Sequence, residues 1–259
     1  VALDGSGNVL SNDVFSATGS GSSTQFSGSY SNPDEAASVA VFYPALTEGD
    51  GSDSTPWYSK FYDSNQSFGT LCDLKKNNNT ITWGSASQLQ PKNADPSFLK
   101  NMVVMRGEVS DITSLVSGKA SATIKNCCYV IKMNIKMPST FSNAQQITLK
   151  ASATISHYGW TYAKSNFGIR NGNTANTISI GLGKELAEDT QMGTGFPIDD
   201  SITAYLVGYT ACSLNLTSGQ TLTVSIDNKS EYTKKQTLTS KITLEPGKMY
   251  RMNIDMTKK

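Results

Sequence analysis

The chain has 259 residues, of which 37% are hydrophobic and 17% charged, and its 22 Lys and Arg nearly balance its 21 Asp and Glu. This length allows one large or two average domains with proper cores. The balanced charge, without a long basic run, argues against nucleic acid or an anionic membrane surface as a partner. No apolar stretch approaches the ~20 residues that span a bilayer. The chain shows no signal peptide and starts at Val1, so we expect a mature or trimmed form.

The composition predicts an all-β protein. The 34 Ser and 27 Thr are many, and the strong helix formers never cluster over a long window. In the N-terminal half, the Gly-, Ser- and Asn-rich first ~20 residues predict a flexible arm, in particular Val1 to Asn12. A short helix is expected over Asp95 to Met102. The predicted strands of this half are Gln25 to Tyr30, Ser38 to Tyr43, Thr80 to Trp83 and Met102 to Ser110.

An aromatic run lies among polar residues between two of these strands, in what we interpret as a long loop. It consists of Trp57, Tyr58, Phe61, Tyr62 and Phe68. Exposed rings there could stack on a sugar or anchor another protein. Alternatively, the rings clamp the loop onto the N-terminal domain, because most large aromatic side chains are largely buried.

The C-terminal half alternates more clearly between apolar and polar residues. A two-residue period predicts strands with one face in a core and one in water. The last two strands are expected to form a hairpin through Glu245, Pro246, Gly247 and Lys248, and Gly183 to Thr190 is a possible short helix. The predicted strands are Tyr129 to Met137, Ile147 to Ile155, Ile178 to Leu182, Leu222 to Ile226, Leu238 to Leu244 and Tyr250 to Met256.

Many short strands with polar turns favour two tandem antiparallel β-sandwich domains and argue against a parallel α/β fold. The weakly patterned stretch Asp111 to Ser117 suggests the boundary. We therefore predict an N-terminal domain over 1–117, with its flexible arm, and a C-terminal domain over 118–259.

No pattern of residues indicates an enzyme, a cofactor or a metal. The single histidine, His157, is interpreted as structural, because no catalytic motif accompanies it. The acidic groupings Asp199-Asp200 and Glu185 with Glu188-Asp189 are interpreted as solvated, and the Gly181 to Lys184 segment lacks the spacing of a phosphate-binding loop. Asp50, Ser52 and Asp53 could offer oxygen ligands to calcium, but a polar turn is favoured because no downstream bidentate Glu follows.

The four cysteines do not have zinc-ligand spacing. They are Cys72, Cys127, Cys128 and Cys212. The adjacent pair points to opposite faces of a strand, so we expect one of the two to be buried. Pairing with Cys72 or Cys212 stays open, and we favour free, mostly buried thiols.

Several segments together resemble the fimbrillin family of Bacteroides-type bacteria, in the same order along nearly the whole chain. Each motif alone is common, and the resemblance lies in their order and spacing. The segments are Ala40-Val41-Phe42-Tyr43-Pro44, Ile81-Thr82-Trp83 followed by Gln88-Leu89-Gln90-Pro91, Met102-Val103-Val104-Met105, and Leu244-Glu245-Pro246-Gly247-Lys248-Met249-Tyr250.

The resemblance implies two transthyretin-like domains and export as a lipoprotein to the outer membrane. It also implies removal of an N-terminal strand and assembly into a cell-surface pilus by donor-strand exchange with other subunits. Stalk subunits carry a C-terminal extension, whereas here the sequence stops soon after Met256. A tip or accessory role in adhesion is therefore expected, unless the last predicted strand is itself donated. Its possible assembly residues are Tyr250, Met252, Ile254 and Met256.

A surface glycan-binding lipoprotein that works as a monomer is the alternative. Its possible ligand loop carries Trp57, Tyr58, Phe61 and Tyr62, which could equally bind a host or bacterial surface protein. Both functions place the protein at the cell surface, without a catalytic role.

Overall fold

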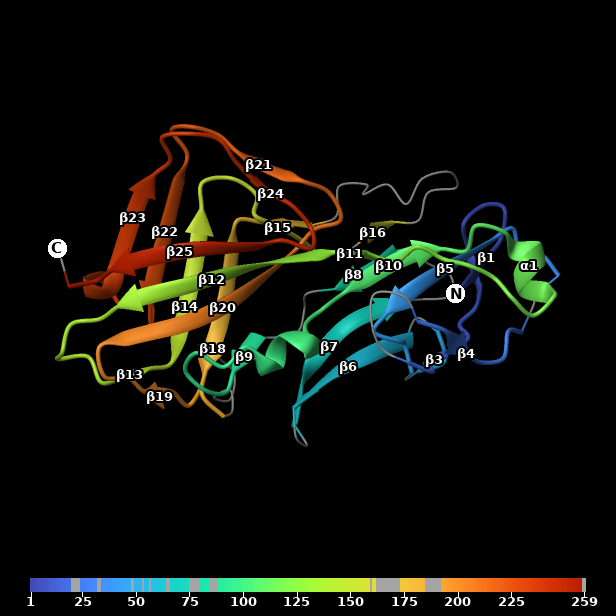
Figure 1. Cartoon of the computed structure of the whole chain (residues 1–259), viewed down its shortest axis with the longest axis horizontal. Helices are drawn as coiled ribbons and strands as arrows, with labels where there is room; N and C mark the ends of the chain where they lie inside the picture. The colour runs from blue at the N-terminus through green and yellow to red at the C-terminus, as the bar shows by residue number, and fades with distance from the viewer. Residues whose placement is uncertain are drawn as a thin grey trace.

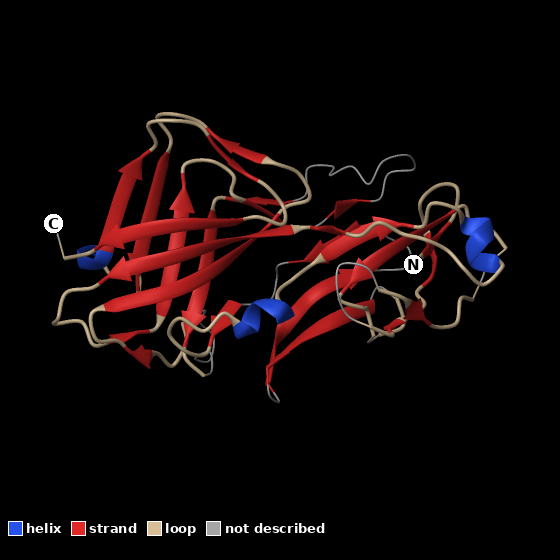
Figure 2. Cartoon of the chain, in the orientation of Figure 1, coloured by secondary structure: helices blue, strands red, loops and turns tan. Residues whose placement is uncertain are grey.

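The protein is all-β in a computed structural model of the chain, with 46% of residues in strands and 7% in helices. Strands dominate the molecule throughout (Figure 2). The structure describes residues 1–19, 24–31, 34–47, 49–52, 54–55, 57–63, 66–74, 80–83, 88–158, 160–161, 173–184 and 192–257.

Antiparallel strands, all but β16 from the first half of the chain, lie together at one end of the molecule (Figure 1). One sheet has the order β11 (Lys125–Asn126), β10 (Met105–Glu108), β5 (Ser38–Tyr43), β1 (Ala2–Leu3) and β2 (Val9–Ser11). Another has the order β16 (Trp160–Thr161), β8 (Thr80–Trp83), β7 (Gln66–Leu74) and β6 (Trp57–Asp63). A small pair joins β3 (Ser16–Ala17) to β4 (Phe26–Ser27).

The first residues are not a flexible arm, so that prediction was wrong. Ala2 pairs with Val39 of β5 and with Ser11 of β2, and Ala2, Leu3 and Val9 are buried. The sequence offers few apolar residues here, but these three all enter the core, and ladder hydrogen bonds hold the backbone between them.

Two layers of strands form the other end of the molecule (Figure 1). One layer has the order β20 (Ser201–Tyr209), β12 (Cys128–Lys136) and β25 (Met249–Asp255). It lies across a second layer with the order β23 (Thr233–Thr237), β22 (Thr221–Ile226), β14 (Gln146–Ala151), β18 (Thr177–Leu182) and β9 (Gln88–Gln90). Short pairs complete this end: β13 (Asn143–Ala144) with β19 (Phe196–Pro197), β15 (Ser156–Tyr158) with β17 (Asn173–Ala175), and β21 (Leu214–Leu216) with β24 (Ile242–Leu244).

The predicted alternation is confirmed in these layers. Along β12, Tyr129, Ile131, Met133 and Ile135 are buried, and the residues between them are partly exposed. The inner faces of β14, β18 and β22 contribute Ile147, Leu149, Ile178, Ile180, Leu182, Leu222, Val224 and Ile226 to the same core. Residues two apart share a face of a strand, so these apolar rows fix which side of each strand faces inward.

Among the described residues, two strand pairs are parallel, which corrects the expectation of purely antiparallel sheets. β25 runs parallel to β12, and β9 runs parallel to β18. The predicted hairpin between the last two strands was therefore wrong. β24 pairs with β21, and the turn at residues 245–248 carries the chain from that short pair to β25 in the layer of β12.

The proposed boundary near Ser117 and Gly118 coincides with a helix end. Helix α1 (Ile112–Val116) is capped by Asp111, and Gly118 has a φ of +95°, which favours glycine. The strand pairing does not divide at this point, since β11 pairs with β10 and β9 lies in a C-terminal layer. The division into 1–117 and 118–259 stays a prediction.

The expected short helix near Asp95 is confirmed as the 3-10 helix η1 (Ser97–Asn101), and a second 3-10 turn, η2 (Ser230–Tyr232), precedes β23. Most of the helix expected over Gly183 to Thr190 lies outside the described residues.

Candidate functional site

The aromatic segment expected to form a ligand loop is a strand. Trp57, Tyr58, Phe61 and Tyr62 lie on β6, which pairs with β7 in an antiparallel hairpin. Their side chains lie outside the described residues. The sequence predicts a loop because these rings sit among Ser, Asp and Asn, and the strand corrects that prediction. A ligand site on these rings stays a prediction.

The possible assembly residues lie on β25 and at its end. Tyr250, Met252 and Ile254 point inward, are half-buried and pack against the core, and Met256 is buried. In register they stand beside Ile131, Met133 and Ile135 of β12. Among the described residues, β25 pairs with β12 alone, so it is an edge strand. Its inward side chains are half-exposed, and no further strand in the described part of the chain covers them.

Tyr250 fixes the chain crossing that leads into β25. Its hydroxyl donates to the carbonyl oxygen of Thr243 at 2.8 Å and accepts from the backbone N–H of Glu245 at 2.7 Å. Its ring meets that of Tyr129 edge to face, with centroids 6.0 Å apart. The start of β25 is therefore attached both to its own turn and to the core.

The outer backbone edge of β25 faces away from β12. Val130 N–H donates to Lys248 O at 3.0 Å, and Met256 N–H donates to Lys136 O at 2.9 Å, so the even-numbered residues of this segment face β12. The N–H and C=O groups of Met249, Arg251 and Asn253 therefore point outward. These residues are exposed, with 52% for Met249. We call this row of outward groups the β25 edge.

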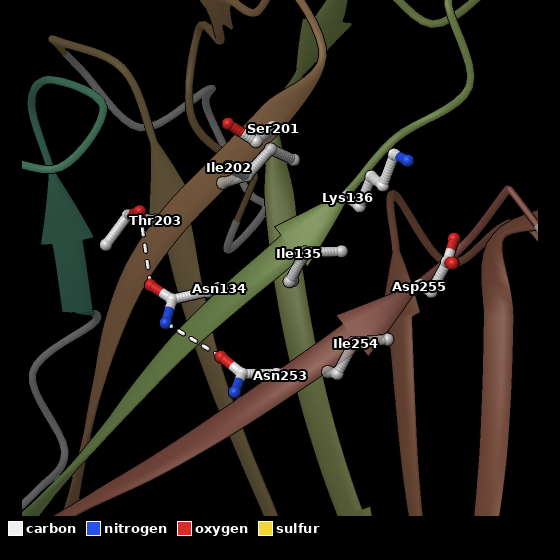
Figure 3. A pocket seen from close by; sticks show the side chains of 9 residues that line it. All are labelled: Asn134, Ile135, Lys136, Ser201, Ile202, Thr203, Asn253, Ile254 and Asp255. Atoms are coloured by element: carbon white, nitrogen blue, oxygen red, sulfur yellow. Dashed lines mark hydrogen bonds between the residues drawn. The ribbon is translucent and has the colours of Figure 1, made fainter.

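A shallow hollow of about 380 Å³ lies where β20, β12 and β25 run side by side (Figure 3). On its polar side, Asn134 Nδ2 donates to Asn253 Oδ1 at 2.9 Å, and Thr203 Oγ1 donates to Asn134 Oδ1 at 3.4 Å. Lys136 and Asp255 lie at its end. This amide row joins the side chains of the three strands and presents hydrogen-bonding groups to solvent.

The opposite edge of the same layer is closed by side chains that act like a further strand. Gln88 bonds both N–H and C=O of Val207, at 2.9 and 2.6 Å. Gln90 accepts from Tyr205 N–H at 3.0 Å and donates to Thr203 O at 2.8 Å. Further along β20, Asn93 bonds Ser201 and Thr203, and Ser156 bonds Tyr209.

Sequence reasoning missed this closed edge. The available signal was the spacing of Gln88 and Gln90, which places both amides on one side of a strand. Because side chains occupy the hydrogen-bonding groups of β20, another strand cannot add there without displacing them. The β25 edge has no comparable covering among the described residues.

The surroundings of His157 agree with the structural role that the sequence suggests for it. It is buried, and its Nδ1 lies 3.2 Å from Thr210 Oγ1. Burial lowers the pKa of the imidazole. Asp50 closes a turn by accepting from Ser52 N–H, and Asp53 lies outside the described residues. In the described part of the chain, no three His, Cys, Asp or Glu side chains are grouped closely enough to hold a metal ion.

Three of the four cysteines are free thiols, as expected. Cys127 and Cys128 are buried, and Cys212 is exposed. Burial raises the pKa of the Cys127 thiol to about 12. The side chain of Cys72 lies outside the described residues.

No family model matches the chain, and no curated protein matches it significantly. Among the helices that the structure describes, none has the length and apolar character that crossing a bilayer requires.

Proposed function

We propose that the protein is a structural subunit of a cell-surface fimbria, in a tip or accessory position, that assembles with other subunits by β-strand exchange or addition. The observation that carries this proposal is β25, a seven-residue edge strand. The β25 edge presents outward backbone groups, and the apolar side chains of the strand are half-buried. An extended segment bound there gains affinity from backbone hydrogen bonds and register from side chains. The sequence resemblance to fimbrillins supports the same function.

The contrast between the two edges of the layer strengthens the proposal. Gln88, Gln90, Asn93 and Ser156 close β20, so the protein is protected on that side against strand addition. An uncovered edge strand such as β25 can pair with other chains and aggregate. Leaving it open is therefore a disadvantage unless a partner strand binds there. β25 could accept a partner strand in place, or it could itself be donated, since it is bound on one side only.

At the level of architecture, we infer two tandem transthyretin-like β-sandwiches, with the two C-terminal layers as one of them. Export as a lipoprotein and attachment to the outer membrane belong to the same proposal, as does a role in adhesion without catalysis. Cofactors are not part of it.

The direct test examines surface fibres from the bacterium that encodes the chain. We expect antibodies against the protein to label fibre tips or shafts, and sheared fibres to contain the protein in multimers that resist detergent. Loss of the gene should remove the label and change fibre length or adhesion. A protein found only as a detergent-soluble monomer, with unchanged fibres in the deletion strain, would contradict the proposal.

A second candidate function is glycan binding at the cell surface. The amide row and hollow favour it, because amide, hydroxyl and charged groups there can hydrogen-bond sugar hydroxyls. If the hollow binds a glycan, Asn253→Ala should weaken binding to a glycan array while Asn143→Ala, at an exposed site on β13, should not. Equal binding by both variants would remove this candidate.

A further inference from the structure

The side chains along the β25 edge are complementary to a second copy of themselves. Arg251, Asn253 and Asp255 follow one another on the outer face as cation, amide and anion. If two copies of β25 run antiparallel with Asn253 opposite its own copy, Arg251 of each chain stands opposite Asp255 of the other. Opposite charges directly across an antiparallel pair stabilise it.

We propose that two copies of this protein associate through antiparallel pairing of their β25 strands, centred on Asn253. A two-fold axis then passes through the pairing, and each copy uses the same surface, as in most homodimers. The layer β20-β12-β25 continues into the second copy as β25-β12-β20.

The backbone fits this register. Arg251 and Asn253 both direct their N–H and C=O groups outward, as the ladder to β12 requires. Residues that face the partner in this way form the closely hydrogen-bonded pairs of an antiparallel ladder. Asn253 and its copy exchange two such bonds at the centre. The chain therefore needs no register shift or bulge to form the pairing.

The inner face of β25 gives the pairing an apolar component. Met252 and Ile254 are half-buried at the rim of the core. In the proposed register, Met252 of one copy lies opposite Ile254 of the other, and Tyr250 lies opposite Met256. Contact between these side chains removes their remaining apolar surface from water, which favours association.

Two other edges of this end, those of β20 and β23, do not fit a second copy as well. The β20 edge is closed by amide and hydroxyl side chains. The β23 edge carries the adjacent Lys234 and Lys235, and charged residues on an edge oppose strand addition. On β25, by contrast, the charges match in the antiparallel register.

This inference goes beyond the fimbrial proposal and does not depend on it. A two-fold pairing closes after two copies and does not by itself build a fibre. It concerns the isolated protein in solution, so it can be right or wrong whether or not the chain occurs in fimbriae.

The test uses charge reversal and measures mass by sedimentation of the full chain over a range of concentrations. The wild-type protein should show a concentration-dependent dimer. Arg251→Glu makes the edge wholly acidic, and Asp255→Lys makes it wholly basic, so each variant alone should dimerise at least about tenfold more weakly. An equal mixture of the two should form a heterodimer, because each reversed charge then meets its opposite. Lys119→Glu, an equal charge change at an exposed loop residue, should dimerise like the wild type.

A backbone variant tests the same pairing without changing charge. Asn253→Pro removes one outward N–H and places a ring at the edge, while the bonds of residues 252 and 254 to β12 remain possible. We expect a folded monomer by circular dichroism and sedimentation. A wild-type protein that stays monomeric at every concentration would overturn the proposal. So would dimers of the Arg251→Glu variant as strong as those of Lys119→Glu.

Discussion

Burial decides the chemistry of individual side chains in this protein, and the adjacent cysteines illustrate this. Cys127 and Cys128 precede and begin β12, and both side chains are buried although neighbours on a strand point to opposite faces. Arg106 partly offsets the effect of burial on Cys127, but the pKa of its thiol is still raised to about 12. A thiol in such a site is protonated at neutral pH and does not react readily.

We therefore expect a thiol-alkylating reagent to modify Cys212 in the native protein at neutral pH and to leave Cys127 and Cys128 unmodified. All of these thiols should react once the protein is unfolded in denaturant. Peptide mass spectrometry after timed alkylation gives the result. Fast native modification of Cys127 would show that the start of β12 is not packed as described.

His157 should make the fold sensitive to mild acid. Its pKa is lowered by burial, so between the folded pKa and the ordinary value of about 6.5 the unfolded chain binds more protons than the folded chain. The free energy of unfolding should therefore fall as the pH drops below about 6.5, and level off below the folded pKa. The chain has no other histidine.

The measurement is urea unfolding at several pH values from neutral to mildly acidic, for the wild type and for His157→Gln. The variant should show a shallower loss of stability in this range. The buried α-amino group of Val1, with its pKa lowered to about 6, changes stability in the same direction, so the difference between the two proteins isolates His157. Parallel curves for the two proteins would contradict this role.

At the scale of single elements, position within a layer determines how much each strand contributes. Ile135 on the central β12 is fully buried, whereas Ile254 stands beside it on β25 and is half-buried. The same truncation should therefore cost different amounts at the two positions. We expect Ile135→Ala to lower the free energy of unfolding by about 2–5 kcal/mol and Ile254→Ala by about 1–2 kcal/mol.

Chemical denaturation of both variants checks this order. Equal losses would mean that β25 is covered in solution, for example by a partner copy. Repeating the measurement on diluted protein would then separate the loss of folding stability from the loss of association. No loss at all for Ile254→Ala would show that β25 is not docked on β12.

The closed edge of β20 should depend on Gln90. This side chain is fully buried and supplies the only acceptor described for Tyr205 N–H, whereas Thr203 O also accepts from Ala94 N–H at 3.1 Å. Gln90→Leu keeps similar volume but leaves that buried N–H without its partner, which should cost about 1–3 kcal/mol.

Gln236→Leu, at an exposed position on β23, is the matched control and should change stability little. Unfolding midpoints of the two variants in urea give the comparison. A Gln90→Leu protein as stable as the control would mean that another group replaces the amide.

Alternation in the sequence predicts faces well and neighbours poorly. The sequence predicts a strand over Tyr129 to Met137 because the inward residues are apolar and Lys132, Asn134 and Lys136 between them are polar. The same pattern at Tyr250 to Met256 predicted the buried face correctly but not the parallel pairing with β12. A period of two says which side chains point inward, whereas the partner depends on where the turn at 245–248 carries the chain.

The remaining differences also have physical reasons. The strands at Val1 to Ser11 are too short to show a period, and their stability comes from contacts with β5, distant in sequence. The sequence predicts the residues of β25 as a possible assembly strand, and this role stays a prediction. It could not show that β20 is closed, because that depends on Gln88 and Gln90 reaching a strand more than a hundred residues away.

At the scale of the whole molecule, the two-layer end is not closed on every side, because the β25 edge is not covered by described residues. One layer ends in side-chain amides at β20 and in outward backbone groups at β25. The central claim of the fimbrial proposal is that this edge engages another subunit in the assembled state.

Amide hydrogen exchange tests that claim most directly, comparing dilute free protein with surface fibres that contain it. Arg251 and Asn253 amides should exchange rapidly in the free protein, because they point to water, and Met252 and Ile254 amides should be protected by β12. In fibres, the Arg251 and Asn253 amides should become protected as well. Rapid exchange of these two amides in both states would contradict assembly through β25.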